Sequence, residues 1–355
     1  MLENGSEFVG TGFGAGEGKV CEVVFNTSVV GYQEIISDPS YAGQIIVMTY
    51  PLIGNYGITD EDYESRTQWS LGGLVVRECC DTPSNFRYTK TLEEELEDRG
   101  IPCVSGVDTR MLTRIIRDAG SMRGIITDAS TPVEEALEAI RNDVPDKDLA
   151  VKASCRKRWF SRTPNHNYNV VAVDCGIKHS VIRELNSIGC NVTIMPCTVE
   201  AKDILAFNPD GVVFSSGPGA AEDIPGVSEL FLALKGRLPI FGIGLGHQVI
   251  GTAYGAKLLK MAPGIHGDQP VRDCTTGRIT IGVLNQNWQF DRGSLEAAGL
   301  EVTHVSVPGG IVEGFRSCKD EVFTLMFNPE AAPGPQDNIG LFATFVQMME
   351  DHRNA

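Results

Sequence analysis

The sequence predicts an α/β protein of two domains, an N-terminal α+β domain followed by a doubly wound α/β domain. Its 355 residues are enough for two hydrophobic cores. Strands and short helices mix before about residue 150, whereas strands and helices alternate regularly after residue 168. Such alternation is typical of a parallel sheet with helices on both faces. We therefore expect domains at 1–154 and 168–355, joined by a linker at 155–167.

Composition excludes several classes of function. The net charge of −16 argues against binding to a nucleic-acid backbone, which requires clustered Lys and Arg. No segment approaches the roughly 20 apolar residues of a membrane span, and the N-terminus lacks the features of a signal peptide, so we expect a cytoplasmic protein with no nucleic-acid or membrane partner. The ten cysteines include no C-x-x-C pair. We expect reduced, structural thiols and no metal site.

Start and stop signals define the elements of the first domain. Three helices are predicted, each beginning at a residue that can cap it: Thr91, Asp108 and Thr131, the last followed by proline. Gly100 and Gly120 end the first two helices. Apolar runs predict strands at 20–25, 44–50 and 71–76, the second buried on both faces.

Two glycine-rich or basic segments of this region carry weaker signals. Residues 10–16 contain four glycines but lack a preceding strand and a following helix, so we predict a hairpin or loop and no nucleotide-binding loop. Residues 155–166 are basic and contain Pro and Asn without apolar periodicity. We interpret them as the linker and disfavour a nucleic-acid patch, because the chain is acidic overall.

The second domain has a regular order of elements. Strands are predicted at 170–173, 191–195, 211–214 and 239–243, helices at about 179–188, 200–206, 227–235 and from 246, shorter strands at 278–283, 302–307, 311–315 and 322–327, and a last helix near 340–350. Doubly wound sheets bind ligands at the carboxyl ends of their strands. A loop at 215–219 and a turn at Gly244 lie at two such ends.

The turn at Gly244 has the pattern of a nucleophile turn. A strand runs into a tight, glycine-flanked turn and then into a helix, a geometry that raises one side chain above a parallel sheet. Gly244 has no side chain to raise. Three possibilities follow: an enzyme with other catalytic residues, a former enzyme, or a reused scaffold.

Two sets of motifs carry a resemblance to a known family. Gly242-x-x-Leu245-Gly246-His247-Gln248 and Asn328-Pro329-Glu330 resemble the G-I-C-L-G-H-Q and H-P-E patterns of class I glutamine amidotransferases. Segments of the N-terminal half are similar to the small subunits of carbamoyl-phosphate synthetases: 22–28, 31–34, 38–41, 49–57 and 108–110. The resemblance spans nearly the whole chain. It implies a class I amidotransferase-like second domain.

The resemblance also implies a mechanism that this chain cannot complete. In that family a cysteine attacks the glutamine amide, a histidine moves the proton and a glutamate orients the histidine. These positions fall on Gly244, Asn328 and Glu330. Glycine offers no nucleophile, and an asparagine amide does not titrate near neutrality. We expect no glutaminase activity, and a large-subunit partner that uses free ammonia.

The same resemblance assigns the glutamine-contacting positions. They are Ser40, Gly217, Gly219, Leu245, Gln248, Asn287, Gln289 and Phe290. The family's Q-N-H-G-F reads Q-N-W-Q-F here, so Trp288 and Gln289 add side chains next to the substrate. The pocket is expected to hold glutamine, another small amino acid, or neither. ATP and Mg²⁺ would belong to the large subunit, which serves pyrimidine or arginine biosynthesis, and this chain is expected to need no cofactor.

Other side chains are expected to be structural. His247 lies in the matched string at the start of a helix, and His304 alternates with apolar residues on a strand. Ser215 and Ser216 are interpreted as loop hydroxyls. Two alternatives to a non-hydrolytic subunit stay open: an active glutaminase whose nucleophile was removed by engineering, and a regulatory protein that binds a ligand in the altered pocket.

Overall fold

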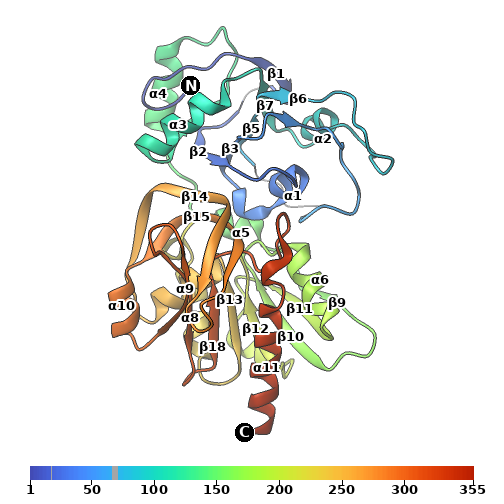
Figure 1. Cartoon of the computed structure of the whole chain (residues 1–355), viewed down its shortest axis with the longest axis vertical. Coiled ribbons are helices and arrows are strands. Elements are labelled where there is room, and N and C mark those ends of the chain that lie inside the picture. The colour runs from blue at the N-terminus through green and yellow to red at the C-terminus, as the bar shows by residue number, and fades with distance from the viewer. Residues whose placement is uncertain (17, 66–70) are drawn as a thin grey trace. The chain divides into compact units, whose positions relative to one another are not determined.

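The computed structural model describes residues 1–16, 18–65 and 71–355 (Figure 1). The chain divides into two compact units. Unit 1 comprises residues 1–146 and 261–267, and unit 2 comprises residues 147–260 and 268–355. Each unit has its own sheet and hydrophobic core, as the predicted fold class requires.

Unit 1 is built on a six-stranded sheet in the order β1-β7-β5-β3-β2-β8. The strands are β1 (Thr11–Gly14), β2 (Cys21–Asn26), β3 (Gln44–Met48), β5 (Gly73–Val75), β7 (Pro102–Ser105) and β8 (Met122–Gly124), while β4 (Leu52–Ile53) and β6 (Glu78–Cys79) form a separate pair. The four inner strands are parallel and the two outer strands are antiparallel to their neighbours. Every residue of β3 is buried, which confirms the prediction of a strand covered on both faces.

The prediction of a hairpin or loop at 10–16 is wrong, because this segment contains strand β1. Its partner is β7, with Thr11 opposite Ser105, so the pairing joins residues 94 positions apart. The glycines permit close approach: a Cβ on Gly10 would lie 2.2 Å from the Ser105 carbonyl oxygen, and one on Gly14 would lie 2.5 Å from that of Ile101. A strand whose partner is distant leaves no local signal.

Two of the three predicted caps, Thr91 and Asp108, are confirmed among the helices of unit 1. These helices are α1 (Tyr32–Ser37), η1 (Pro39–Tyr41), α2 (Leu92–Asp98), α3 (Thr109–Ala119) and α4 (Val133–Asn142). Asp108 accepts a hydrogen bond from the Met111 amide at the start of α3. At α4, Pro132 stands at the N-cap, whereas Thr131 instead hydrogen-bonds Thr127 through its side chain. The predicted Thr131 cap is therefore wrong.

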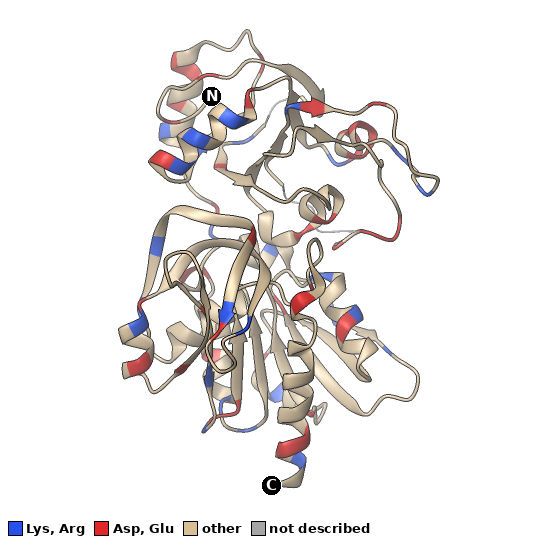
Figure 2. Cartoon of the chain, in the orientation of Figure 1, with Lys and Arg blue, Asp and Glu red and all other residues tan. Residues whose placement is uncertain are grey.

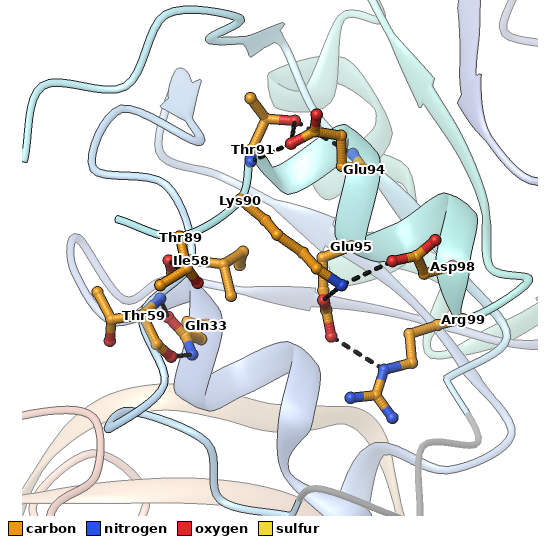
Figure 3. Close-up of polar contacts among 10 residues, drawn as sticks. All are labelled: Gln33, Ile58, Thr59, Thr89, Lys90, Thr91, Glu94, Glu95, Asp98 and Arg99. Atoms are coloured by element: carbon orange, nitrogen blue, oxygen red, sulfur yellow. Dashed lines mark hydrogen bonds and ion pairs between the residues drawn. The ribbon is translucent and has the colours of Figure 1, made fainter. Parts of the chain in front are cut away.

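Polar contacts support α2 (Figure 3). Thr91 and Glu94 form the predicted capping box, in which each residue's side chain bonds the other's backbone N–H. One turn on, the buried Glu95 carboxylate lies 3.2 Å from Lys90 Nζ and 2.9 Å from Arg99 Nε. The helix start is thus specified by local sequence, and its buried carboxylate is compensated by two cations.

Unit 2 is built on a ten-stranded sheet in the order β15-β14-β16-β17-β18-β13-β12-β10-β11-β9. The strands are β9 (Trp159–Ser161), β10 (Tyr168–Asp174), β11 (Cys190–Pro196), β12 (Gly211–Phe214), β13 (Ile240–Ile243), β14 (Leu258–Asp273), β15 (Ile279–Phe290), β16 (Glu301–Ser306), β17 (Val312–Ser317) and β18 (Val322–Leu325). The five strands that lie side by side in the order β18-β13-β12-β10-β11 are parallel to their neighbours. This confirms the predicted parallel core of the sheet.

Helices cover both faces of this sheet. They are α5 (Leu149–Ala153), α6 (His179–Ser187), α7 (Ala201–Leu205), α8 (Pro225–Leu234), α9 (Leu245–Ala253), α10 (Arg292–Ala297) and α11 (Leu341–Asn354). Phe214 packs against Phe231 of α8, whereas Phe241, on the opposite face, packs against Phe342 and Phe345 of α11. The arrangement is doubly wound.

Two segments differ from the sequence-based expectation. Part of the expected linker, 159–161, forms edge strand β9, which pairs antiparallel with β11 inside unit 2. Its basic residues cover aromatic rings: the Arg158 guanidinium lies 5.2 Å from the Phe207 ring centroid. Strands β14 and β15 were expected only in part, at 278–283. Residues 261–267 of β14 belong to unit 1, where the Thr27 amide donates to the His266 carbonyl.

Charged side chains of both signs are interspersed along each unit (Figure 2). Within the described part of the chain, none of the helices has the length and apolar character needed to cross a membrane.

Candidate functional site

The turn between β13 and α9 has the backbone geometry of a nucleophile turn. Gly244 adopts φ 56° and ψ −110°, a strained conformation for any residue with a Cβ. Its amide donates to the Leu325 carbonyl at 2.8 Å, and its own carbonyl accepts from the Gln248 amide at 3.2 Å. These bonds attach the turn to β18 on one side and to α9 on the other. The turn thus has the backbone conformation of a nucleophile turn, although residue 244 has no side chain.

Space for a side chain remains at position 244. A Cβ built on Gly244 would lie 3.2 Å from Ser216 Cβ and 4.0 Å from the Met326 carbonyl oxygen. The neighbouring glycine is required for packing, because a Cβ on Gly246 would lie 2.2 Å from the Phe214 carbonyl oxygen. A cysteine at 244 therefore requires only small shifts of its neighbours, whereas a side chain at 246 does not fit.

Asn328 lies at the carboxyl end of β18, beside the strand that leads to Gly244. Its amide donates to the Val283 carbonyl of β15 at 2.8 Å, and the residue is buried. The Gly244 amide is bonded only three residues earlier, at Leu325. The fold thus brings the nucleophile and base positions to the carboxyl ends of adjacent parallel strands. Neither residue can exchange a proton near neutral pH.

Glu330, the remaining member of the expected triad, is bound by a lysine. Lys178 Nζ lies 2.8 Å from Glu330 Oε1, and both side chains are 0% exposed. Lys178 also donates to the Ala332 carbonyl. Apart from this ion pair, neither carboxylate oxygen of Glu330 has a hydrogen-bond partner among the described residues. Sequence reasoning missed Lys178; its only local signal is a charge within a mainly apolar segment after β10.

The expected substrate positions occupy two units. Ser40 lies in unit 1, in η1, where its amide donates to Asp38 Oδ1 at 2.8 Å. The other seven lie in unit 2, in the loops after β12, on α9 and on β15: Gly217, Gly219, Leu245, Gln248, Asn287, Gln289 and Phe290. The side chains of Leu245 and Phe290 belong to the hydrophobic core, so these two residues could contact a ligand only through their backbone atoms.

Several buried polar side-chain atoms of unit 2 have no hydrogen-bond partner among the described residues. They include Ser216 Oγ, Gln248 Oε1, Gln286 Oε1 and both carboxylate oxygens of Glu313. Ser216 adjoins Gly244, and the Glu313 carbonyl accepts from the Met326 amide of the strand end that holds the turn. Burial raises the pKa of Glu313 well above its usual value, which favours the neutral acid. Unpaired buried polar atoms are typical of a ligand site.

Two buried histidines of unit 2, His247 and His304, are structural. His247 is buried, its Nδ1 lies 2.9 Å from Thr324 Oγ1, and burial lowers its pKa to about 3. His304 Nδ1 lies 3.0 Å from Thr303 Oγ1, and burial lowers its pKa as well. Both imidazoles are neutral at physiological pH. A buried imidazole that resists protonation is a poor general base.

Comparisons with known proteins assign both halves of the chain. Residues 1–126 match the family model of the carbamoyl-phosphate synthase small chain, CPSase domain, and residues 171–348 match class I glutamine amidotransferase. The carbamoyl phosphate synthase small chain of Bacillus caldolyticus is 42% identical over 352 residues, which cover 99% of this chain and 96% of that protein. This chain belongs to the carbamoyl-phosphate synthase small-chain family.

Other members of the family are equally similar. The small chain of Staphylococcus epidermidis is 43% identical over 354 residues, covering 99% of this chain and 96% of its own length. The pyrimidine-specific small chain of Bacillus subtilis is 40% identical over 351 residues, covering 99% and 95%. In this chain a CPSase domain is followed by a class I glutamine amidotransferase domain.

Proposed function

We propose that this chain is a small subunit that supports a carbamoyl-phosphate synthase large subunit without hydrolysing glutamine. The observation that carries the proposal is the joint absence of a nucleophile and a base, since positions 244 and 328 are Gly and Asn at adjacent strand ends. Nitrogen would then reach the large subunit as free ammonia. ATP and Mg²⁺ would be bound by that large subunit.

The magnitude of the catalytic loss favours this proposal. In triad hydrolases that lose their catalytic groups, substrate binding and the oxyanion hole leave only about 10³- to 10⁴-fold acceleration over water. That residual rate is too slow to supply a synthetase. The buried Lys178–Glu330 pair and the intact turn support a retained structural role, because they preserve the fold without the triad.

The test is an assay of nitrogen donors. The chain is purified with its large subunit, and carbamoyl phosphate formation is measured with glutamine or with ammonium chloride. We expect synthesis from ammonium and none above background from glutamine. A glutamine-dependent rate that rivals the ammonium-dependent rate would overturn the proposal. Failure to co-purify with any large subunit would instead favour a protein with another role.

A second candidate function is ligand sensing in the altered pocket. The unpaired polar atoms of Ser216, Gln248 and Glu313 favour it, because a small polar ligand could satisfy them. Thermal unfolding with glutamine, glutamate and other amino acids tests it, since a ligand that binds the native state raises the melting temperature. An engineered removal of the nucleophile is disfavoured, because one substitution suffices for that purpose and Asn328, Trp288 and Gln289 also differ from the family pattern.

The name of one relative suggests the biosynthetic pathway that a carbamoyl-phosphate synthase containing this chain would serve. One relative is named a pyrimidine-specific small chain, and we propose pyrimidine or arginine biosynthesis as the process served. A cytoplasmic location is part of the same proposal.

A further inference from the structure

Three cysteines of unit 2 lie close together near the carboxyl ends of β10 and β11. These strands are parallel, and their last paired residues are Asp174 and Pro196. Cys175 and Cys197 follow directly, so they leave the two strands side by side. Both side chains belong to the same buried hydrophobic cluster, and each shifts the pKa of the other thiol through hydrogen bonding. Cys155 is near, since its amide donates to Asp174 Oδ2 at 2.8 Å.

The surroundings distinguish the three thiols chemically. The Cys175 hydrogen bond and a second from the Ser154 hydroxyl lower the pKa of Cys197 to about 7, whereas the pKa of Cys175 is raised. Burial and the Asp174 carboxylate raise the pKa of Cys155 to about 12. Of the two thiols, Cys197 therefore forms the thiolate more readily, and the thiolate is the form that attacks an oxidant.

Access to the pair comes from the surface turn after β11. Cys197 begins this turn, its amide donates to Ser154 Oγ at 3.0 Å, and the next residue, Thr198, is exposed. Cys197 itself is 4% exposed and Cys175 is 1% exposed. Of the two residues, Cys197 is the one that lies directly next to an exposed residue of this turn.

We propose that Cys175 and Cys197 form a reversible disulfide when the chain meets a peroxide. The Cys197 thiolate attacks one peroxide oxygen, which breaks the O–O bond and yields a sulfenic acid and, with one proton, water. The Cys175 sulfur then attacks the sulfenic sulfur, loses its proton, and releases the hydroxyl as a second water. In total the two thiols lose two protons and two electrons, and one peroxide becomes two waters. A dithiol reductant reverses the reaction.

The oxidised pair would adjoin the site described above. The Cys175 amide donates to Ser215 Oγ at 2.9 Å, and a Cβ on Gly217 would lie 2.1 Å from the Cys175 carbonyl oxygen. Lys178 follows three residues later and holds Glu330. A bond between the sulfurs therefore constrains the backbone that carries this buried ion pair.

The experiment maps disulfides in the full-length chain. Folded protein is treated with hydrogen peroxide, free thiols are blocked with N-ethylmaleimide, and tryptic peptides are identified by mass spectrometry without reduction. We expect peptide 163–178 linked to peptide 184–202, a mass loss of two hydrogens, and recovery with dithiothreitol. Fragment ions must place the second sulfur at 197, because Cys190 lies in the same peptide.

Variants sharpen the result. Cys175→Ser and Cys197→Ser should each abolish the linkage, whereas the matched control Cys155→Ser should retain it. The map of the unsubstituted chain decides the question even if a variant fails to fold. A linkage through Cys155 or Cys190, oxidation to sulfinic or sulfonic acid without a linkage, or no reaction would each overturn the proposal.

Discussion

Lys178 and Glu330 form an ion pair inside unit 2, with 2.8 Å between Nζ and Oε1 and no exposed surface on either side chain. In the family resembled, the glutamate at this position orients the catalytic histidine. Here Asn328 replaces that histidine, and the lysine supplies the opposite charge that a buried carboxylate requires. The structure thus gives Glu330 a buried charge partner other than the residue at position 328.

We expect Lys178→Met to lower the free energy of unfolding by about 3–5 kcal/mol, because it leaves the buried Glu330 charge uncompensated. The double variant Lys178→Met with Glu330→Met should lose less than the sum of the single losses, since both charges are then gone. These free energies are measured by urea unfolding of the chain, followed by fluorescence or circular dichroism. A single-variant loss below 1 kcal/mol would show that the pair contributes little.

Gly244→Cys is expected to destabilise the chain by about 1–3 kcal/mol, because a residue with a Cβ must adopt φ 56° and ψ −110° there. Gly226→Cys is the matched control. A Cβ at Gly226, in α8, has no neighbouring atom within 4 Å and no positive φ. Equal stability of the two variants in urea unfolding would contradict the predicted strain at the turn.

Restoring the triad should require more than one substitution. Gly244→Cys or Asn328→His alone should release no ammonia from glutamine, because a nucleophile and a base act together. The double variant should exceed either single variant by about 100-fold or more, the usual contribution of a positioned base. Adding Trp288→His and Gln289→Gly, the family's residues, should raise the rate again. Full activity in the double variant alone would indicate that Trp288 and Gln289 do not impair glutamine binding.

His247 should make stability depend on acid pH. Its pKa falls from 6.5 in the unfolded chain to about 3 in the folded one, so the unfolded state binds the proton first. Stability is therefore complete above pH 6.5 and declines by about 1.4 kcal/mol per unit as the pH falls toward 3. His247→Gln should have a shallower decline across this window, measured by unfolding at each pH. If the free energy of unfolding fell equally with pH in the variant and in the unsubstituted chain, His247 would not have this role.

Glu95 should contribute to the stability of unit 1 through its two cations (Figure 3). Its side chain is 2% exposed, whereas Lys90 and Arg99 are 43% and 28% exposed and can turn to solvent when it is lost. We expect Glu95→Ala to cost about 1–3 kcal/mol in thermal or urea unfolding. The exposed neighbour Glu93 is the control, and Glu93→Ala should change stability by less than about 0.5 kcal/mol.

Much of the fold could be predicted because its signals are local. The capping box of Thr91 and Glu94, the Asp108 cap and the alternation of strands after residue 168 each depend on residues within a few positions of one another. Strand β1 could not be predicted, because its partner Ser105 lies 94 residues away and glycine has weak strand propensity. Strand β9 could not be predicted for a similar reason. Its basic, loop-like composition predicts a linker, and only its pairing with β11 makes it a strand.

The sequence by itself determined which chemical groups lie at positions 244 and 328: Gly and Asn carry neither a nucleophile nor a group that titrates near neutral pH, whatever the fold. Only the tertiary structure decided what surrounds them. It placed Lys178 on Glu330 across 152 residues of chain and set Cys175 beside Cys197 at two parallel strand ends. The chemical identity of a side chain is set by its own position in the sequence. Charge compensation and thiol pairing instead depend on which distant positions the sheet brings together.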